Sequence, residues 1–330
     1  MLLDHVDGRP DLRNRKLTAR TLLMSMAVGV TALALISEIG LRHFAGLGDP
    51  VTVTNDSSCG YILTPNQHKR RFGKWMSVNQ YGMRSGPVSP NKFGGVYRIL
   101  LVGDSILYGT SQVGQEQIFA TLLNRELPAV THRSLEVLNA SAGGWAIANE
   151  ADYIRSRGTF RSDLVVLVLN SGDLPQPRAS INEGNDAPRG PYACAWCEVW
   201  ARLIKPKITS VGRSQNDPGT QLRADPIQTA NNLRLLDRFE STVTVAQAKM
   251  GIIFIAFRKY VPEGAQQSAP SELVAWSEHK HVPLLDLTSC QSNVPTGELT
   301  IDGVHLSAAG NRIVATAIER NWRRLDPAGT

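Results

Sequence analysis

The stretch Arg98-Ile99-Leu100-Leu101-Val102-Gly103-Asp104-Ser105-Ile106 decides how the rest of the chain is interpreted. An apolar run of branched side chains stops at a glycine, and a carboxylate and a serine follow. This pattern predicts a buried parallel strand, a tight turn and the start of a helix. Ligands of open α/β sheets bind at the carboxyl ends of the strands, so we expect Ser105 at the edge of a crevice. Taken alone, Asp104 and Ser105 are equally typical of an ordinary helix N-cap.

A second polar cluster, Asp302-Gly303-Val304-His305-Leu306-Ser307, lies near the other end of the chain. It comes after a strand-like stretch at 282–287 and before a helical stretch at 307–325. An aspartate and a histidine three residues apart can share one face of a turn, so the carboxylate can hold one ring nitrogen while the other faces a serine hydroxyl. A serine hydroxyl needs such a base to become a good nucleophile. By itself, an Asp-x-x-His pair is more often a helix-start cap.

These two clusters and two blocks between them resemble the GDSL/SGNH hydrolases. The blocks follow the order of that family over residues 97–324, and together they are more specific than any one of them. The chain also resembles membrane-anchored bacterial members, through Asn79-Gln80-Tyr81-Gly82-Met83-Arg84 ahead of the first predicted strand. The four blocks are Gly103-Asp104-Ser105, Val137-Leu138-Asn139-Ala140-Ser141-Ala142-Gly143-Gly144, the stretch 163–173, and Asp302-x-x-His305.

The resemblance implies a fold and a set of site residues. The fold is a three-layer α/β/α sandwich with a five-stranded parallel sheet, flavodoxin-like in its arrangement, preceded by one transmembrane helix. Ser105 is the implied nucleophile, His305 the general base and then acid, and Asp302 its orienting partner. The backbone N–H groups of Ser105 and Gly144 would hold the oxyanion, each contributing roughly 3 kcal/mol to lowering the barrier. Gly143-Gly144 alone would indicate only a strand-to-loop turn.

The third block departs from the family pattern. Where the family has Gly-x-Asn-Asp, this chain has Asn170-Ser171-Gly172-Asp173, so a glycine takes the position of the asparagine. Asn170 lies two residues earlier, and a two-residue step keeps a strand side chain on the same face. Asn170 either reaches the site as a third oxyanion donor or only caps the following loop. The departure also permits weak or altered activity.

The N-terminal region predicts a membrane anchor. Residues 21–37 carry no charge, and a stretch of this length is at the short end of what spans a bilayer. The apolar character continues past Glu38 to Leu41. A cleaved signal peptide, with a site near Ala32-Leu33-Ala34, and a buried core helix are the alternatives that we rank lower. Basic residues before the segment predict a cytoplasmic N-terminus and a catalytic domain in the periplasm or outside; these are Arg9, Arg13, Arg15, Lys16 and Arg20.

We therefore expect four parts in the chain: a cytoplasmic tail at 1–20, a transmembrane anchor at 21–41, a polar, turn-rich lead-in at 42–96, and the SGNH domain at 97–330. Strands are predicted at 97–103, 135–140, 164–170 and 252–257. Helices are predicted after Ser105, around 146–156 and over 222–250. An insertion rich in Pro, Gly and Asn interrupts the domain at about 174–225.

The chain has four cysteines. Cys194-Ala195-Trp196-Cys197 would indicate redox chemistry or half a zinc site in the cytosol. In the oxidising compartment inferred here, disulfides are favoured over a metal. Sequence alone does not fix the pairing, and Cys194–Cys197 with Cys59–Cys290 is our preferred arrangement. Trp196 and Trp200 either line a substrate groove or pack a small subdomain, and we prefer packing.

The charge of the chain does not indicate nucleic acid as a partner. The formal net charge is +6, but the basic residues are dispersed and no nucleic-acid-binding motif is present. The run His68-Lys69-Arg70-Arg71, with Phe72 and Trp75, could bind an acidic glycan, although a solvated loop is the preferred interpretation.

The resemblance implies a serine ester hydrolase that acts through an acyl-enzyme on O-acyl groups, O-acetyl foremost, of a cell-envelope or exported carbohydrate. Such chemistry requires no metal or organic cofactor. The alternatives are an O-acetyltransferase of an exported polysaccharide, supplied by an integral membrane acyl-donor partner, and a catalytically weak glycan-binding or assembly scaffold. A lipase ranks lower, because the sequence contains no long apolar lid.

Overall fold

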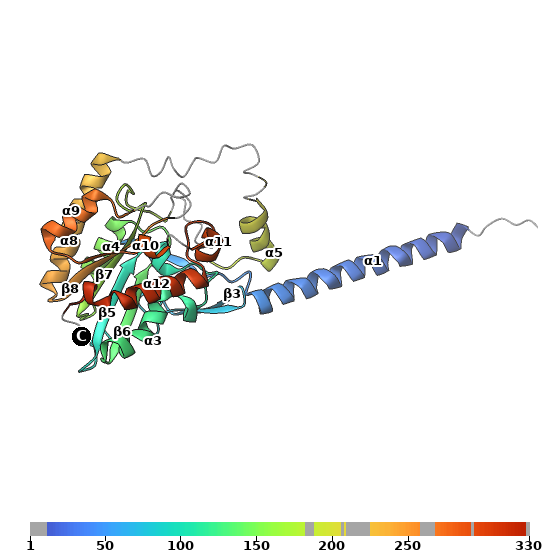
Figure 1. Ribbon diagram of the computed structural model, residues 1–330. Coiled ribbons are helices and arrows are strands. Elements are labelled where there is room, and N and C mark those ends of the chain that lie inside the picture. The colour runs from blue at the N-terminus through green and yellow to red at the C-terminus, as the bar shows by residue number, and fades with distance from the viewer. Residues whose placement is uncertain are drawn as a thin grey trace, which may run out of the picture.

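The computed structural model describes residues 12–181, 188–205, 208, 225–257, 268–291 and 294–327. At its centre is a parallel sheet of five strands in the order β6-β5-β7-β8-β9 (Figure 1). Every residue of β7 is buried, as expected for a strand that is covered on both faces. The strands are β5 (Tyr97–Gly103), β6 (Leu135–Ser141), β7 (Leu164–Asn170), β8 (Lys249–Ile255) and β9 (Leu284–Asp286).

Helices cover both faces of the sheet and form the outer layers. Alternate residues of β5 explain the two cores: Leu100 and Val102 belong to one apolar cluster, and Ile99 and Leu101 to the other. The first cluster lies under α4 (Ile147–Arg157), α8 (Pro226–Val245) and α9 (Ser271–Lys280). The second lies under α3 (Phe119–Thr131), α12 (Ala308–Arg320) and α13 (Trp322–Leu325). The predicted three-layer α/β/α sandwich with a five-stranded parallel sheet is confirmed.

Several elements are shorter than predicted. The helix expected over 222–250 begins at Pro226, because Asp225 caps its N-terminus and proline suits the first turn.

Short helices connect the larger elements in the described part of the chain. They are α2 (Ser105–Tyr108), η2 (Gln115–Gln117), α5 (Ala195–Glu198), η3 (Val199–Ile204), α10 (Thr288–Gln291) and α11 (Thr296–Leu299). Within the expected insertion, residues 182–187, 206–207 and 209–224 lie outside the described residues.

The lead-in contains two antiparallel hairpins. They pair β1 (Val53–Asp56) with β2 (Gly60–Leu63), and β3 (Gln67–Arg71) with β4 (Lys74–Val78). The basic run expected as a solvated loop is therefore a strand. Arg71 at its end is fully buried and forms an ion pair with Glu198, because alternate strand side chains point inward.

The described part of the chain begins with a long helix that projects from the rest of the molecule (Figure 1). It comprises α1 (Leu12–Gly40) and its continuation η1 (Leu41–Ala45). The stretch Thr18–Ala45 is long and apolar enough to cross a membrane, although a signal sequence near the N-terminus has the same properties. The first eleven residues, which include most of the expected tail, lie outside the described residues.

The cysteines form one disulfide, between Cys194 and Cys197. The expected second pair is wrong, because Cys59 and Cys290 are both free thiols. Cys59 belongs to the apolar cluster on one face of the sheet, and Cys290 packs against the cluster on the other face. The sheet thus separates the two sulfur atoms, whereas a disulfide needs Cα atoms within about 7 Å.

Candidate active site

Ser105 lies at the carboxyl end of β5, where the strand turns into α2. The backbone passes close to β7 at this turn: a Cβ on Gly103 would lie 2.9 Å from the Val168 carbonyl oxygen. Only glycine therefore fits at this position. Asp104 caps α2 by accepting a hydrogen bond from the Ile106 N–H at 2.9 Å. An N-cap is therefore present, as the alternative interpretation of this stretch predicted, and Asp104 is the residue that caps. This leaves the Ser105 hydroxyl on the first turn of the helix.

Asp302 and His305 lie in the loop before α12. The Asp302 carboxylate accepts hydrogen bonds from the backbone N–H groups of Val304 at 3.0 Å and His305 at 2.8 Å. Its other oxygen lies 2.7 Å from His305 Nδ1, and His305 Nε2 lies 3.1 Å from Ser105 Oγ. The structure thus brings together two groups two hundred positions apart. With the ring proton on Nδ1, Nε2 is free to accept the serine proton.

The electrostatics of this pair favour a charged imidazole. Burial lowers the pKa of His305, but the hydrogen bond and the charge of Asp302 outweigh burial, so the pKa lies above its ordinary value of 6.5. Burial raises the pKa of Asp302, but hydrogen bonds from the side chain and backbone of His305 outweigh it and hold the pKa below its usual range. Asp302 therefore remains ionised when His305 takes up a proton.

Asn170 lies at the end of β7, beside the serine turn. Its side-chain Nδ2 donates to Asp104 Oδ2 at 2.9 Å, and its Oδ1 accepts from the Gly172 N–H at 2.6 Å. Ser105 Oγ is 3.4 Å from the same Asp104 oxygen. Asn170 thus reaches the serine turn, which the interpretation as an oxyanion donor required. It also bonds into the following loop, which the interpretation as a loop cap required.

Gly144 follows β6 with a φ of +77°, which favours glycine. Tyr61 Oη donates to the Gly143 carbonyl oxygen at 2.8 Å, and Gln176 Nε2 donates to the Gly144 carbonyl oxygen at 3.1 Å. In a trans peptide the carbonyl and the following N–H point in opposite directions. Tyr61 therefore fixes the direction of the Gly144 N–H. Sequence reasoning missed Tyr61 and Gln176, since neither carries a motif.

Two further carboxyl groups lie buried near the serine turn. Asp173 Oδ2 accepts from the Asn170 backbone N–H at 2.6 Å. Glu150, on α4, is fully buried, and among the described residues neither of its carboxylate oxygens has a hydrogen-bond partner. Burial, together with the nearby Asp173 and Asp104, raises the pKa of Glu150 well above its ordinary value. Burial likewise raises the pKa of Asp104.

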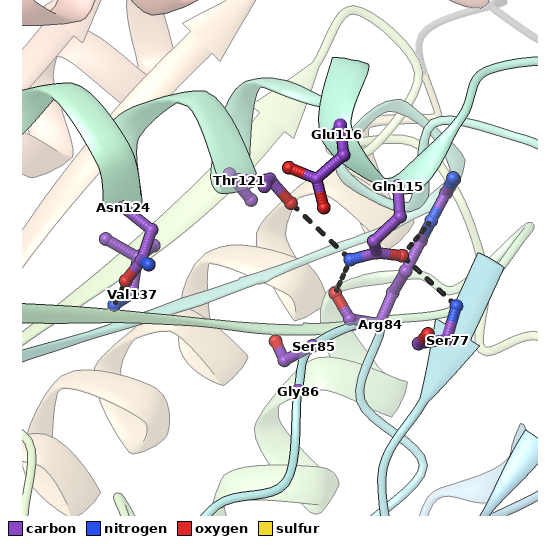
Figure 2. Close-up of a pocket in the computed structure, with 10 residues that line it drawn as sticks. Ser77, Arg84, Ser85, Gly86, Gln115, Glu116, Thr121, Asn124 and Val137 are labelled. Atoms are coloured by element: carbon purple, nitrogen blue, oxygen red, sulfur yellow. Dashed lines mark hydrogen bonds between the residues drawn. The ribbon is translucent and has the colours of Figure 1, made fainter. Parts of the chain in front are cut away.

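A cavity of about 240 Å³ lies elsewhere, at the joint between the lead-in and the domain (Figure 2). Its polar groups mostly bond to each other: Gln115 Nε2 donates to the Arg84 carbonyl oxygen at 3.2 Å and to Thr121 Oγ1 at 3.4 Å. Neither Ser105 nor His305 lines this cavity. We assign it to the packing of the two parts.

Within the part of the chain that the structure describes, no group of three or more His, Cys, Asp or Glu side chains could hold a metal ion. The disulfide also leaves Cys194 and Cys197 without free thiolates for a metal.

No protein-family model matches the chain, and no curated protein matches it in sequence. Solved structures similar to it include the psychrotrophic esterase EstA from Pseudoalteromonas sp., with 13% identity over 69% of this chain and 97% of that chain and a TM-score of 0.44. The acetyl xylan esterase AlAXEase is 17% identical over 67% of this chain and 97% of that one, with a TM-score of 0.41. A lipase/acylhydrolase from Enterococcus faecalis is 19% identical over 70% of this chain and 98% of that one, again at 0.41.

Proposed function

We propose that this protein is a serine ester hydrolase of the SGNH type that acts through an acyl-enzyme. The observation that carries the proposal is the chain of contacts from Ser105 Oγ to His305 Nε2 at 3.1 Å and from His305 Nδ1 to Asp302 at 2.7 Å. A nucleophile within reach of a base, itself oriented by a third group, defines a triad by geometry and not by sequence position.

The reaction follows from these contacts. Ser105 Oγ attacks the acyl carbonyl carbon while His305 Nε2 takes the hydroxyl proton, and Asp302 stabilises the resulting imidazolium. The proton then passes to the leaving alcohol oxygen as the ester bond breaks. Water attacks the acyl-enzyme with His305 as base, which releases the carboxylic acid and restores Ser105. If a sugar hydroxyl replaces water in this step, the same residues perform O-acyl transfer.

The negative oxygen of each tetrahedral intermediate needs hydrogen-bond donors. We assign the backbone N–H groups of Ser105 and Gly144 to it, with the direction of the Gly144 group fixed through Tyr61. The amide nitrogen of Asn170 has two hydrogens, and Asp104 accepts one of them. The second hydrogen of Asn170 is the candidate third donor.

The substrate that suits this site is an O-acyl, foremost O-acetyl, group on a large carbohydrate. The His305 side chain is 27% exposed and that of Asp302 51%, so the reacting groups lie at the surface, where a polymer can reach them. We propose that residues 21–41 anchor the protein in a membrane. The lead-in, 42–96, and the catalytic domain, 97–330, then lie on the outer side of that membrane. The exposed helix and the Cys194–Cys197 disulfide support this placement, because disulfides persist in oxidising compartments.

Replacing the nucleophile tests this function. The full chain and its Ser105→Ala variant are incubated with an aryl acetate, and phenol release is measured. We expect turnover by the wild type and near-complete loss in the variant. Equal turnover by both proteins would refute the assignment. Repeating the assay with an acetylated polysaccharide, with and without an unacetylated acceptor, distinguishes free acetate from transferred acetyl groups.

A further inference from the structure

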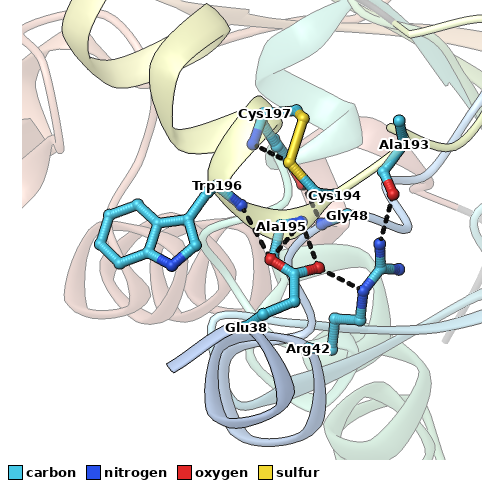
Figure 3. Close-up of a disulfide and its surroundings, with 9 residues drawn as sticks. Glu38, Arg42, Gly48, Ala193, Cys194, Ala195, Trp196 and Cys197 are labelled. Carbon is cyan, nitrogen blue, oxygen red and sulfur yellow. Dashed lines mark hydrogen bonds and ion pairs between the residues drawn. A yellow bond between two sulfur atoms is a disulfide. The ribbon is translucent and has the colours of Figure 1, made fainter. Parts of the chain in front are cut away.

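The outer end of the long helix carries a charge that the structure neutralises. Glu38 interrupts the apolar stretch, and its carboxylate accepts hydrogen bonds from the backbone N–H groups of Ala195 at 2.7 Å and Trp196 at 3.2 Å (Figure 3). Arg42, one turn further on, donates its Nε to the same carboxylate at 2.6 Å. The charge of Glu38 is therefore compensated, and it does not mark the end of the segment that a membrane could cover.

The segment that neutralises Glu38 is fixed to the helix by further contacts. The indole nitrogen of Trp196 donates to Ser37 Oγ at 3.0 Å, and Arg42 Nη2 donates to the Ala193 carbonyl oxygen at 2.9 Å. The Cys194–Cys197 disulfide closes the turn that presents these groups (Figure 3). We call residues 193–197 the clamp. The Trp196 ring consequently lies against the last turn of the charge-free stretch.

Large exposed aromatic side chains lie near the point where this helix meets the rest of the protein. Phe44 lies on the helix itself, and the backbone N–H of Phe72, on the turn between β3 and β4, donates to the Ala45 carbonyl oxygen. Trp196 and Trp200 are four residues apart on one helical segment, so they share a face. These four residues, which we call the exit collar, are exposed by 69% (Phe44), 40% (Phe72), 47% (Trp196) and 54% (Trp200).

The length of the helix places the collar at the boundary of a bilayer. Residues 21–37 rise by about 26 Å at 1.5 Å per residue, whereas the hydrocarbon core is about 30 Å thick. Counted from residue 21, 30 Å corresponds to about 20 residues, so the outer boundary falls near Gly40, between Trp196, which bonds to Ser37, and Phe44. Tryptophan and other amphipathic rings are enriched at this level of membrane proteins.

We propose that the exit collar is embedded in the headgroup layer of the outer leaflet and, with the clamp, seats the catalytic domain directly on the bilayer surface. The occupant of this aromatic surface is thus lipid, contacted in continuity with the exposed apolar helix. The proposal rests on the membrane attachment in the proposed function. It goes further, because a helix alone would tether the domain without fixing its height or orientation.

Quenching of tryptophan fluorescence by lipid tests whether the collar is embedded in the headgroup layer. The full chain is reconstituted into vesicles of phosphatidylglycerol and phosphatidylcholine, with the phosphatidylcholine either plain or brominated at carbons 6 and 7 of one acyl chain. We expect bromine to quench the wild-type emission. The variant with Trp196→Phe and Trp200→Phe should lose most of the quenched component, because those rings are the two tryptophans of the collar.

Two variants complete the test. Trp276→Phe, on α9 of the catalytic domain, removes a tryptophan that is only 9% exposed and should leave the quenched component intact. Cys194→Ser with Cys197→Ser opens the clamp and should reduce quenching while both collar tryptophans are still present. Quenching that is absent in the wild type, or unchanged in the double Trp variant, overturns the proposal.

Aryl acetate turnover by the same samples separates this inference from the proposed function. Turnover without collar quenching would reject only the proposed contact between the collar and lipid. Collar quenching without turnover would reject the esterase assignment alone, since the side chains that hydrogen-bond to Ser105 and His305 are Asp104 and Asp302, which lie outside the collar and the clamp.

Discussion

Asn170 donates its side-chain amide to the Asp104 carboxylate at 2.9 Å, directly beside Ser105. The bond joins the ends of two adjacent strands, β7 and β5, at the edge where the sheet carries its reactive groups. It positions an amide two residues earlier than the family pattern does. We regard the change in the third block as a relocation of the asparagine and not as its loss.

The first prediction concerns this amide. Asn170→Ala should lower kcat for aryl acetate hydrolysis by about 10²-fold, the usual effect of removing an oxyanion donor, with little change in KM. Asn231→Ala, an exposed asparagine on α8 that bonds to Arg234, is the control and should behave as wild type. A change in KM alone would show that Asn170 contributes to binding and not to the transition state.

The second prediction concerns pH. His305 works as a base only when neutral, and its pKa is raised above 6.5, so kcat/KM should fall as the pH drops through a value above 6.5. Asp302→Asn removes the two largest causes that raise the pKa of His305, and leaves burial, which lowers it, and the smaller effect of Asp104, which raises it. The acid limb should then move to lower pH than in the wild type, and kcat should fall by about 10⁴-fold. An acid limb in the same place in both proteins would contradict the proposed coupling.

The sequence predicted the groups that are local or carry a motif. The Gly103-Asp104-Ser105 turn follows from an apolar strand that ends in glycine, and the loop of Asp302 and His305 follows from a spacing of three residues. The meeting of His305 with Ser105 was predictable only through the order of the four blocks. It is a contact across two hundred positions, which no local pattern encodes.

Other features depended on packing that the sequence does not show. Tyr61 bonds to Gly143 from 82 positions away, and its sequence context is an ordinary hairpin strand. The preferred pairing of Cys59 with Cys290 is wrong because the two thiols lie on opposite faces of the sheet, which no local pattern shows. Arg71 was read as part of a solvated run, whereas its partner Glu198 comes from the distant insertion.

The third prediction tests Tyr61 as a positioning residue. Tyr61→Phe removes the hydrogen bond to the Gly143 carbonyl and lets the Gly144 N–H turn away from the oxyanion, so kcat should fall by about tenfold at unchanged KM. Tyr153→Phe is the matched control, because Tyr153 is also buried and donates to the Tyr81 carbonyl oxygen at 3.2 Å. Each variant should lose about 1 kcal/mol of stability, but only Tyr61→Phe should lose turnover. Equal kcat in the two variants would leave Tyr61 with a structural role only.

The fourth prediction concerns the ion pair that holds the insertion against the lead-in. Arg71 and Glu198 are 0% and 2% exposed, and Arg71 Nη1 lies 3.2 Å from Glu198 Oε2. Glu198→Gln leaves the Arg71 charge buried without its counter-charge, so the free energy of unfolding should fall by about 3–5 kcal/mol in urea denaturation. Glu126→Gln removes the partner of Arg312 in a partly exposed pair and should change stability by less than about 1 kcal/mol. Replacing both Arg71 and Glu198 by methionine should restore most of the loss, since no buried charge then remains. If Glu198→Gln is no more damaging than Glu126→Gln, the buried pair does not fasten the insertion to the lead-in.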